Sequence, residues 1–195
     1  MSKKILVIDA NPSKFSLTAC LAEEYSLSAK GNGFDVKTLN LRELEFDPIL
    51  HFGYSRRQTL EPDLEKSQEM LSWCEHLVLF SPVWWYSFPA LLKGFFDRVF
   101  LPEFAFEIKT GPKRQIIKMM SGKTATVFCT YGGPKNNMGT DFEDPFGFQI
   151  KHGILYFCGF ENVEVYPFYE TVGFRNIKRR QNLIDDLIKF GAEGK

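Results

Sequence analysis

Short apolar runs alternate with amphipathic stretches along most of this chain of 195 residues. Continuous apolar runs rich in β-branched residues are typical of strands buried on both faces, and apolar positions three or four apart are typical of helices. Ser16 and Ser87 are expected to cap helices, and Pro62 and Pro89 to lie in first helical turns. The pattern predicts strands at 4–8, 35–41, 77–81, 123–130 and 162–169, and helices at 16–30, 62–75, 87–100, 148–157 and 175–190.

This alternation predicts a three-layer α/β fold. Parallel strands need crossover connections, and right-handed crossovers place helices on both faces of the sheet. Five parallel strands in a chain of this length favour the flavodoxin-like order 2-1-3-4-5 over a six-stranded dinucleotide-binding sheet. Residues 42–60 and 101–121 are expected to be irregular excursions. Because no repeat, low-complexity segment or linker interrupts the pattern, residues 1–195 are expected to form a single domain.

The charge balance narrows the possible partners. Lys plus Arg and Asp plus Glu number 24 each, whereas a nucleic-acid-binding protein usually carries a basic excess, so no nucleic-acid partner is expected. One basic cluster is either an anion site or the solvated face of a helix: Arg175, Lys178, Arg179 and Arg180.

Cysteine usage and apolar run lengths bear on the cellular compartment. The N-terminal apolar run is too short for a signal peptide, and no run is long enough to cross a bilayer, so no membrane insertion is expected. The cysteines are far apart and form no C-x-x-C pair, which favours buried thiols in a reducing compartment. We therefore expect a cytoplasmic protein with four free thiols: Cys20, Cys74, Cys129 and Cys158.

Aromatic residues make up 15% of the chain, with 20 phenylalanines among them. A well-filled core explains such an excess, since each aromatic side chain buries a large area. A stacking surface for a flat ligand is the alternative. Composition alone favours the core.

Several familiar motifs fail on their context. Gly122-Lys-Thr124 enters a predicted strand instead of leaving one, so it is not a P-loop, and Gly31-x-Gly33 lacks the third glycine of a dinucleotide fingerprint. There is no G-x-S-x-G elbow. The three histidines lack metal-ligand spacing, so no metal site is expected.

The loops after the first, third and fourth predicted strands are the candidate site. In an open parallel sheet, ligands bind beyond the carboxyl ends of the strands at the switch point of strand order. The first loop, residues 11–18, is rich in hydroxyl groups and runs into a helix N-terminus, which favours a phosphate. Ser16 and Thr18 can add hydroxyl donors. The alternative is a capped helix without a ligand.

The other two loops complete a pocket. Residues 82–89 include Trp84, Trp85 and Tyr86, which point in different directions and so are hard to pack into one core but can stack on a flat ring. In residues 130–134, Gly132 and Gly133 let the backbone approach a ligand, although a tight turn explains this pair better when the motif is taken alone. A phosphate end, an aromatic wall and a donor-rich edge suit a flavin nucleotide. With no nucleophile–base pair or metal cluster evident, we expect chemistry carried by a cofactor.

Several segments resemble one known family. The chain resembles the flavodoxin-like NAD(P)H:quinone oxidoreductases, that is the DT-diaphorase group and its shorter bacterial relatives. This resemblance implies a homodimer with two flavin sites at the subunit interface, FAD as cofactor with FMN as the alternative, and ping-pong hydride transfer from NAD(P)H to a quinone-like acceptor. The matching segments are Ala10-Asn-Pro, residues 81–100, Glu103-Phe-Ala-Phe106, Thr130-Tyr-Gly-Gly133 and residues 153–160.

The resemblance also implies roles for individual positions. Asn11, Ser16, Leu17 and Thr18 are implied around the flavin phosphate; Pro82, Val83, Trp84, Trp85 and Tyr86 around the isoalloxazine ring; and Thr130, Tyr131, Gly132 and Gly133 along its opposite edge. Arg180 is implied near the adenylate half of FAD. Phe106 and Phe157 match positions that line the acceptor pocket from the partner subunit.

The chain departs from the family at two points. Relatives usually begin the first loop with His-Pro, where this chain has Asn11-Pro12. Animal members carry a Tyr and a His after the paired glycines, where an ungapped count gives Met138 and Asp144. Backbone N–H groups of the turn could then stabilise charge on the reduced flavin. Short relatives also include a transporter subunit, so the alternatives are a flavin-binding regulatory subunit of a membrane transporter, or an azo- or nitroreductase.

Overall fold

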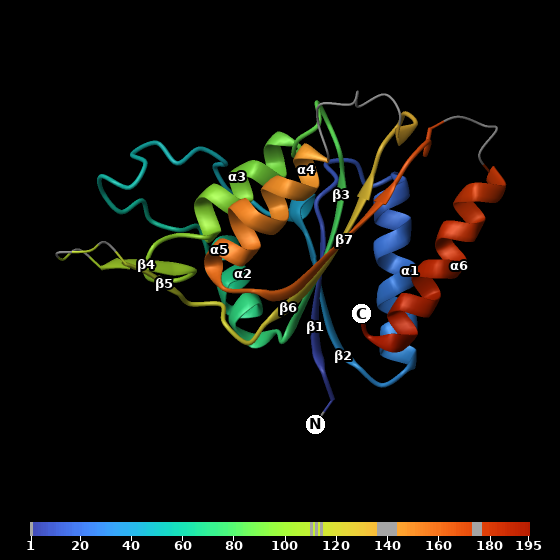
Figure 1. Cartoon of the computed structure of the whole chain (residues 1–195), viewed down its shortest axis with the longest axis horizontal. Coiled ribbons are helices and arrows are strands. Elements are labelled where there is room, and N and C mark those ends of the chain that lie inside the picture. Colours follow the sequence, from blue (N-terminus) through green and yellow to red (C-terminus); the bar gives the residue numbers. More distant parts are fainter. Residues whose placement is uncertain (1, 110, 112, 114, 136–143, 173–176) are drawn as a thin grey trace.

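A computed structural model describes residues 2–109, 111, 113, 115–135, 144–172 and 177–195. Its main sheet is parallel, with the strand order β2-β1-β3-β6-β7. The predicted order 2-1-3-4-5 is therefore confirmed, since β6 and β7 are the fourth and fifth strands of this sheet (Figure 1). The strands are β1 (Lys4–Asp9), β2 (Asp35–Asn40), β3 (His76–Pro82), β6 (Thr124–Thr130) and β7 (Glu161–Phe168).

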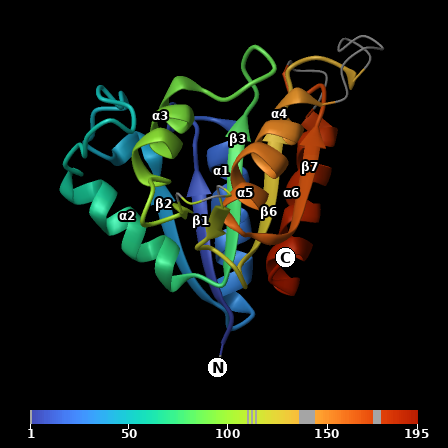
Figure 2. The same ribbon diagram turned by 60° about the vertical axis from the view of Figure 1, so that its left-hand side comes forward.

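Helices cover both faces of this sheet, as Figures 1 and 2 show. On one face lie α1 (Leu17–Gly31) and α6 (Ile177–Glu193). On the other lie α2 (Pro62–Trp73), α3 (Ala90–Val99) and the continuous run of α4 (Pro145–Phe148), a π-helical segment (Gln149–Leu155) and α5 (Tyr156–Cys158). Each face has its own apolar core, so the fold has the three predicted layers.

The aromatic excess fills much of these two cores. Between the sheet and α1 lie Tyr25, Phe80 and Phe128, with the two phenylalanine rings stacked at a centroid distance of 5.0 Å. The opposite core holds further buried phenylalanines, among them Phe95 and Phe146. Burial of such rings contributes about 1.5–3 kcal/mol each to folding. Packing therefore explains a large share of the phenylalanines, as composition favoured.

The excursion expected at residues 101–121 contains an antiparallel hairpin, so the expectation of irregular structure there was wrong. Its strands are β4 (Phe106–Lys109) and β5 (Gln115–Lys118), paired from Phe106 opposite Lys118 to Lys109 opposite Gln115. Each strand has only four residues, so the apolar–charged alternation of β4 is too brief to mark a strand, and the mostly exposed β5 shows no alternation. The excursion at 42–60 has only the 3₁₀ turn η1 (Leu41–Glu43).

Two helix starts also differ from the sequence prediction. Pro89 is the N-cap residue of α3 and not part of its first turn, while Ser87 pairs with the backbone of Trp84 instead of capping the helix. The helix predicted at 148–157 begins earlier, at Pro145. Ser16, by contrast, is confirmed as the N-cap of α1, because its hydroxyl oxygen accepts a hydrogen bond from the Ala19 amide at 3.2 Å.

The cysteines are free thiols, as expected. Cys74, Cys129 and Cys158 are buried and Cys20 is half-buried. Burial raises the pKa of Cys74 to about 11 and that of Cys158 to about 12, so these thiols stay protonated and unreactive. Within the described ranges, no helix is both long and apolar enough to span a membrane.

Candidate functional site

The three candidate loops lie side by side at one edge of the sheet. β3 pairs with β1 on one side and with β6 on the other, so the carboxyl ends of these strands are neighbours. Backbone hydrogen bonds join the ends directly: the Ala10 amide donates to the Phe80 carbonyl at 2.9 Å, and the Val83 amide to the Thr130 carbonyl at 3.0 Å. The fold thus brings together the three segments that the sequence singled out.

The loop after β1 presents hydrogen-bond donors at the start of α1. Among the described residues, the amides of Leu17 and Thr18 have no acceptor, as expected for the first turn of a helix. Ser16 and Leu17 are half-buried, whereas Asn11 and Thr18 are only 8% and 1% exposed. The surface of the loop therefore offers backbone N–H groups and Ser16, with Asn11 and Thr18 lying beneath them. Such an arrangement suits a phosphate.

The loop after β3 is a tight turn that carries three exposed rings. Trp84 and Ser87 exchange two backbone hydrogen bonds of 3.1 and 2.9 Å, and between them Trp85 and Tyr86 have φ angles of 53° and 56°. Side chains in this left-handed region cost roughly 1–2 kcal/mol each, and such strain gathers at functional sites. Trp84, Trp85 and Tyr86 are 47%, 98% and 45% exposed. These rings are a surface feature and not part of the core.

Pro82 and Val83 hold that turn in place. Pro82 is the buried last residue of β3, and Val83 is half-buried against the core. Both predicted residues therefore lie at the root of the loop, and the exposed rings lie at its tip.

The loop after β6 offers two further donors. In the part of the chain that the structure describes, neither the Gly132 amide nor the Gly133 amide donates a hydrogen bond. A Cβ atom on Gly132 would lie 3.2 Å from the Val172 side chain, so a larger residue would crowd the turn. The buried Thr130 carbonyl already accepts the Val83 amide. The free amides can therefore face a ligand with partial negative charge.

Tyr131 anchors this turn through both its backbone and its ring. Its carbonyl accepts the amide and the hydroxyl of Thr171, each at 3.0 Å. The ring stacks on Tyr169 with centroids 4.9 Å apart, and the hydroxyl donates to the Asp144 carboxylate. Burial, together with this hydrogen bond, raises the pKa of Tyr131 well above its usual range, so the phenol stays protonated.

Arg180 reaches the same edge from α6. Its Nε and Nη2 atoms donate to the Thr171 carbonyl at 3.1 and 2.8 Å. Since Thr171 also binds Tyr131, the guanidinium lies close to the glycine turn. Of the other basic residues in this cluster, Arg179 pairs with Glu170, and Arg175 lies outside the described residues. Met138, in the segment after the glycine turn, also lies outside the described residues.

Phe106 and Phe157 lie elsewhere in the chain. Their rings meet edge to face with centroids 5.1 Å apart, and Phe106 is only 6% exposed. Phe106 opens the β4–β5 hairpin, which Figure 1 shows well to the side of the carboxyl ends of β3 and β6. The structure brings these two residues together but does not join them to the three loops of the same chain.

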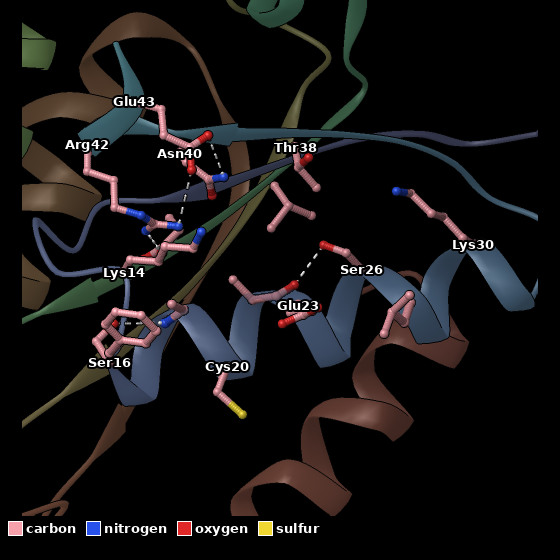
Figure 3. A pocket seen from close by; sticks show the side chains of 16 residues that line it. Lys14, Ser16, Cys20, Glu23, Ser26, Lys30, Thr38, Asn40, Arg42 and Glu43 are labelled. Carbon is pink, nitrogen blue, oxygen red and sulfur yellow. Dashed lines mark hydrogen bonds and ion pairs between the residues drawn. The ribbon is translucent and has the colours of Figure 1, made fainter.

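Sequence reasoning missed a buried ion pair beneath the first loop. Arg42, in the turn after β2, binds Asp9, which is 2% exposed at the end of β1. Burial raises the pKa of Asp9, although the hydrogen bond from Arg42 opposes the shift. The two residues are 33 positions apart in the sequence, so no local pattern signals the pair. A groove of about 690 Å³ between α1 and β2 lies beside it (Figure 3).

The chemistry of this donor set fits a flavin nucleotide. Free N–H groups and Ser16 lie at the start of α1, exposed aromatic rings lie above β3, and two free amides lie beyond β6. A ligand with a phosphate at one end and a flat, hydrogen-bonding ring at the other can use all three loops at once.

Comparison with known proteins gives a consistent result. Residues 3–189 of this chain match the sequence model of a protein family that is described as having a flavodoxin-like fold. An NAD(P)H oxidoreductase of Haemophilus influenzae, itself uncharacterized, is 26% identical over 92% of this chain and 90% of its own length. A ribosyldihydronicotinamide dehydrogenase (quinone) of Pongo abelii is 27% identical over 82% and 78%. A crystal structure from Streptococcus mutans has a TM-score of 0.79 at 28% identity and covers 97% of this chain and 99% of its own.

Proposed function

Because the chain belongs to the family with the flavodoxin-like fold, whose model matches residues 3–189, we propose that it is a flavin-dependent NAD(P)H:acceptor oxidoreductase. The enzyme class follows from the relatives, which are named as an NAD(P)H oxidoreductase and a ribosyldihydronicotinamide dehydrogenase (quinone). One observation supports flavin as the cofactor. Free N–H donors that can bind a phosphate, exposed aromatic rings and the free amides of the glycine turn lie together at one edge of the sheet.

Each loop has its own task in this proposal. The Leu17 and Thr18 amides and the Ser16 hydroxyl hold the phosphate. The turn at Trp84–Tyr86 covers the ring system and keeps water from it, and the amides of Gly132 and Gly133 stabilise negative charge at the ring edge. A bound flavin supplies the hydride chemistry, taking two electrons from NAD(P)H and passing them to the acceptor. We propose that the two substrates use the pocket in turn, which gives ping-pong kinetics.

FAD is the proposed cofactor, with FMN as the alternative. Arg180 supports FAD, because two of its guanidinium nitrogens are held by Thr171 beside the site while Nη1 has no partner among the described residues. A guanidinium held beside the glycine turn can bind the second phosphate that FAD has and FMN lacks.

A homodimer is part of the proposal. Phe106 and Phe157 would then line the acceptor pocket of the partner subunit, because within one chain they lie away from the three loops. Light scattering of the purified protein gives the oligomeric state. A monomer with full activity would remove these two residues from the site.

Anaerobic titration with NADH and NADPH tests the function. The proposal expects bleaching of the flavin absorbance by at least one of the two, and turnover with the quinone menadione. Faster turnover of an azo dye or a nitroaromatic compound would reassign the acceptor. Flavin binding without any turnover, together with capture of a membrane transporter, would favour a regulatory subunit.

A further inference from the structure

A chain of buried polar contacts runs beneath the loop that follows β1. The Asp9 carboxylate binds Arg42 through Oδ2, and its Oδ1 atom accepts a hydrogen bond from the backbone amide of Asn11 at 3.1 Å. Figure 3 shows Arg42 reaching in from the end of β2 on the side of the groove opposite α1, where Ser16 lies. The ion pair therefore fixes the first turn of the loop against two strands of the sheet.

The orientation of the Asn11 side-chain amide follows from its two hydrogen-bond partners. The Ser13 amide lies 2.9 Å from one end of the Asn11 side chain and, being an N–H group, can only donate, so the side-chain oxygen must face it. The side-chain nitrogen then faces Thr18 and donates to its hydroxyl oxygen at 2.9 Å. Asn11 is 8% exposed and Thr18 1%, so water does not compete for these bonds.

This donation sets the direction of the next hydrogen bond, between the hydroxyls of Thr18 and Ser16 at 3.2 Å. A hydroxyl has one hydrogen and two lone pairs. If Ser16 donated to Thr18, the lone pairs of Thr18 would be filled and its own hydrogen would be buried without an acceptor, which costs about 1–3 kcal/mol. Thr18 therefore donates to Ser16.

The Ser16 hydroxyl is then left with only its hydrogen to offer to a ligand. Its oxygen accepts both the Thr18 hydroxyl and the Ala19 amide, so both lone pairs are in use. Its hydrogen has no acceptor among the described residues and is therefore available to a bound ligand. The two free amides of Leu17 and Thr18 are next to it.

We propose that Asn11 and Thr18 are positioning residues that make the Ser16 hydroxyl a dedicated donor to the phosphate of the bound nucleotide. The proposal rests on the proposed flavin site and deepens it. Asn11 and Thr18 act through Ser16 and do not touch the phosphate with their side chains. The Ser16 hydroxyl would contact the phosphate and not the ring. Losing this contact should therefore weaken the binding of FMN but not of riboflavin, which has the same ring and no phosphate.

Titration of the apoprotein with FMN and with riboflavin tests this inference. Thr18→Val keeps the shape of the side chain but removes its hydroxyl, and we expect FMN to bind about fivefold to tenfold more weakly while riboflavin affinity stays within about twofold. Thr18→Ser restores the hydroxyl and is expected to restore FMN binding. Thr38→Val is the control, because Thr38 lines the groove beside Ser16 but lies outside this hydrogen-bond chain.

A double variant separates positioning from general loss of structure. Ser16→Ala removes the donor itself, so Ser16→Ala combined with Thr18→Val should bind FMN no more weakly than Ser16→Ala alone. If Thr18→Val does not fold, as judged by circular dichroism, Asn11→Ala makes the same comparison.

Equal losses for FMN and riboflavin, or additive losses in the double variant, overturn the inference and leave a structural role only. A wild-type protein that binds none of FAD, FMN and riboflavin overturns the proposed function as well, and this failure is distinguishable because it appears without any substitution.

Discussion

The Tyr131 hydroxyl donates a hydrogen bond to the Asp144 carboxylate, which ties the end of β6 to the start of α4. The glycine turn at 132–133 begins at this anchor, while the amides that face the proposed ligand belong to the backbone. The side-chain bond therefore shapes the turn from behind. It connects Asp144 to the glycine turn as a support and not as a direct contact with the ligand.

Tyr131→Phe should accordingly lower stability more than flavin affinity. Loss of a buried hydrogen bond to a charged group costs about 1–2 kcal/mol, and we expect FMN affinity to fall by less than about threefold. Urea unfolding and FMN titration measure the two effects. The control is Tyr166→Phe, because the Tyr166 hydroxyl bonds the Glu164 carboxylate on the surface at 2.9 Å. Unchanged stability with lost flavin binding would mean that the Tyr131 hydroxyl meets the ligand itself.

Trp84→Ala is predicted to weaken flavin retention. Trp84 is 47% exposed on a turn held by two backbone hydrogen bonds, so its ring is available as a wall for a flat ligand. Loss of one stacked ring should weaken binding about tenfold. Equilibrium dialysis measures the change. Ile116→Ala is the control, because Ile116 is a similarly exposed apolar side chain on the distant β5. Equal flavin occupancy in Trp84→Ala and wild type would assign the ring to another contact.

The pattern of apolar and polar residues along the sequence made the fold and the three loops predictable. Fully buried strands such as β3 have an unbroken apolar run, and their order places the loops at one edge before any contact is known. Contacts between distant positions were not predictable. Asp9 and Arg42 meet across 33 residues, and Asp144 meets Tyr131 across 13, so their partners depend on the folded chain. The β4–β5 hairpin was not predicted, because strands of only four residues are too short to show a periodic pattern.

Arg98 is predicted to hold the long irregular segment at 44–61. It is fully buried in α3 and donates to Glu61 at 2.8 Å, to the Thr59 carbonyl at 3.0 Å and to the Asp47 carbonyl. Arg98→Met should cost about 2–4 kcal/mol of stability and speed proteolysis of that segment, because it leaves several partners unsatisfied.

Lys93→Met is the matched control for Arg98, since Lys93 makes an exposed ion pair with Asp97 on the same helix. Its expected cost is below about 0.5 kcal/mol. Urea unfolding and limited proteolysis measure both variants. Similar small costs for the two would show that the Arg98 bonds do not hold the segment.

His76 is predicted to make the protein less stable in acid. It is 4% exposed at the start of β3, and burial, with the charge of Lys3 as a further cause, lowers its pKa to about 3. A histidine in the unfolded chain titrates near 6.5, so between these values the unfolded chain binds a proton that the folded chain does not. Acid therefore favours unfolding, by about 2 kcal/mol between about pH 8 and about pH 5.

His76→Asn removes this titration and keeps a polar partner for the Thr124 hydroxyl, which lies 2.7 Å from Nδ1. Urea unfolding at both pH values, for wild type and variant, isolates the contribution of His76 because all other groups are shared. The same loss on acidification in both proteins would show that His76 is not the cause.

The central claim is that the three loops hold a flavin nucleotide, and cofactor extraction tests it most directly. The purified protein is denatured, the released compound is identified by mass, and the apoprotein is titrated with FAD and FMN. We predict a yellow protein that releases FAD or FMN and rebinds that nucleotide at one site per chain. A colourless protein whose apo form binds neither FAD nor FMN would contradict the account.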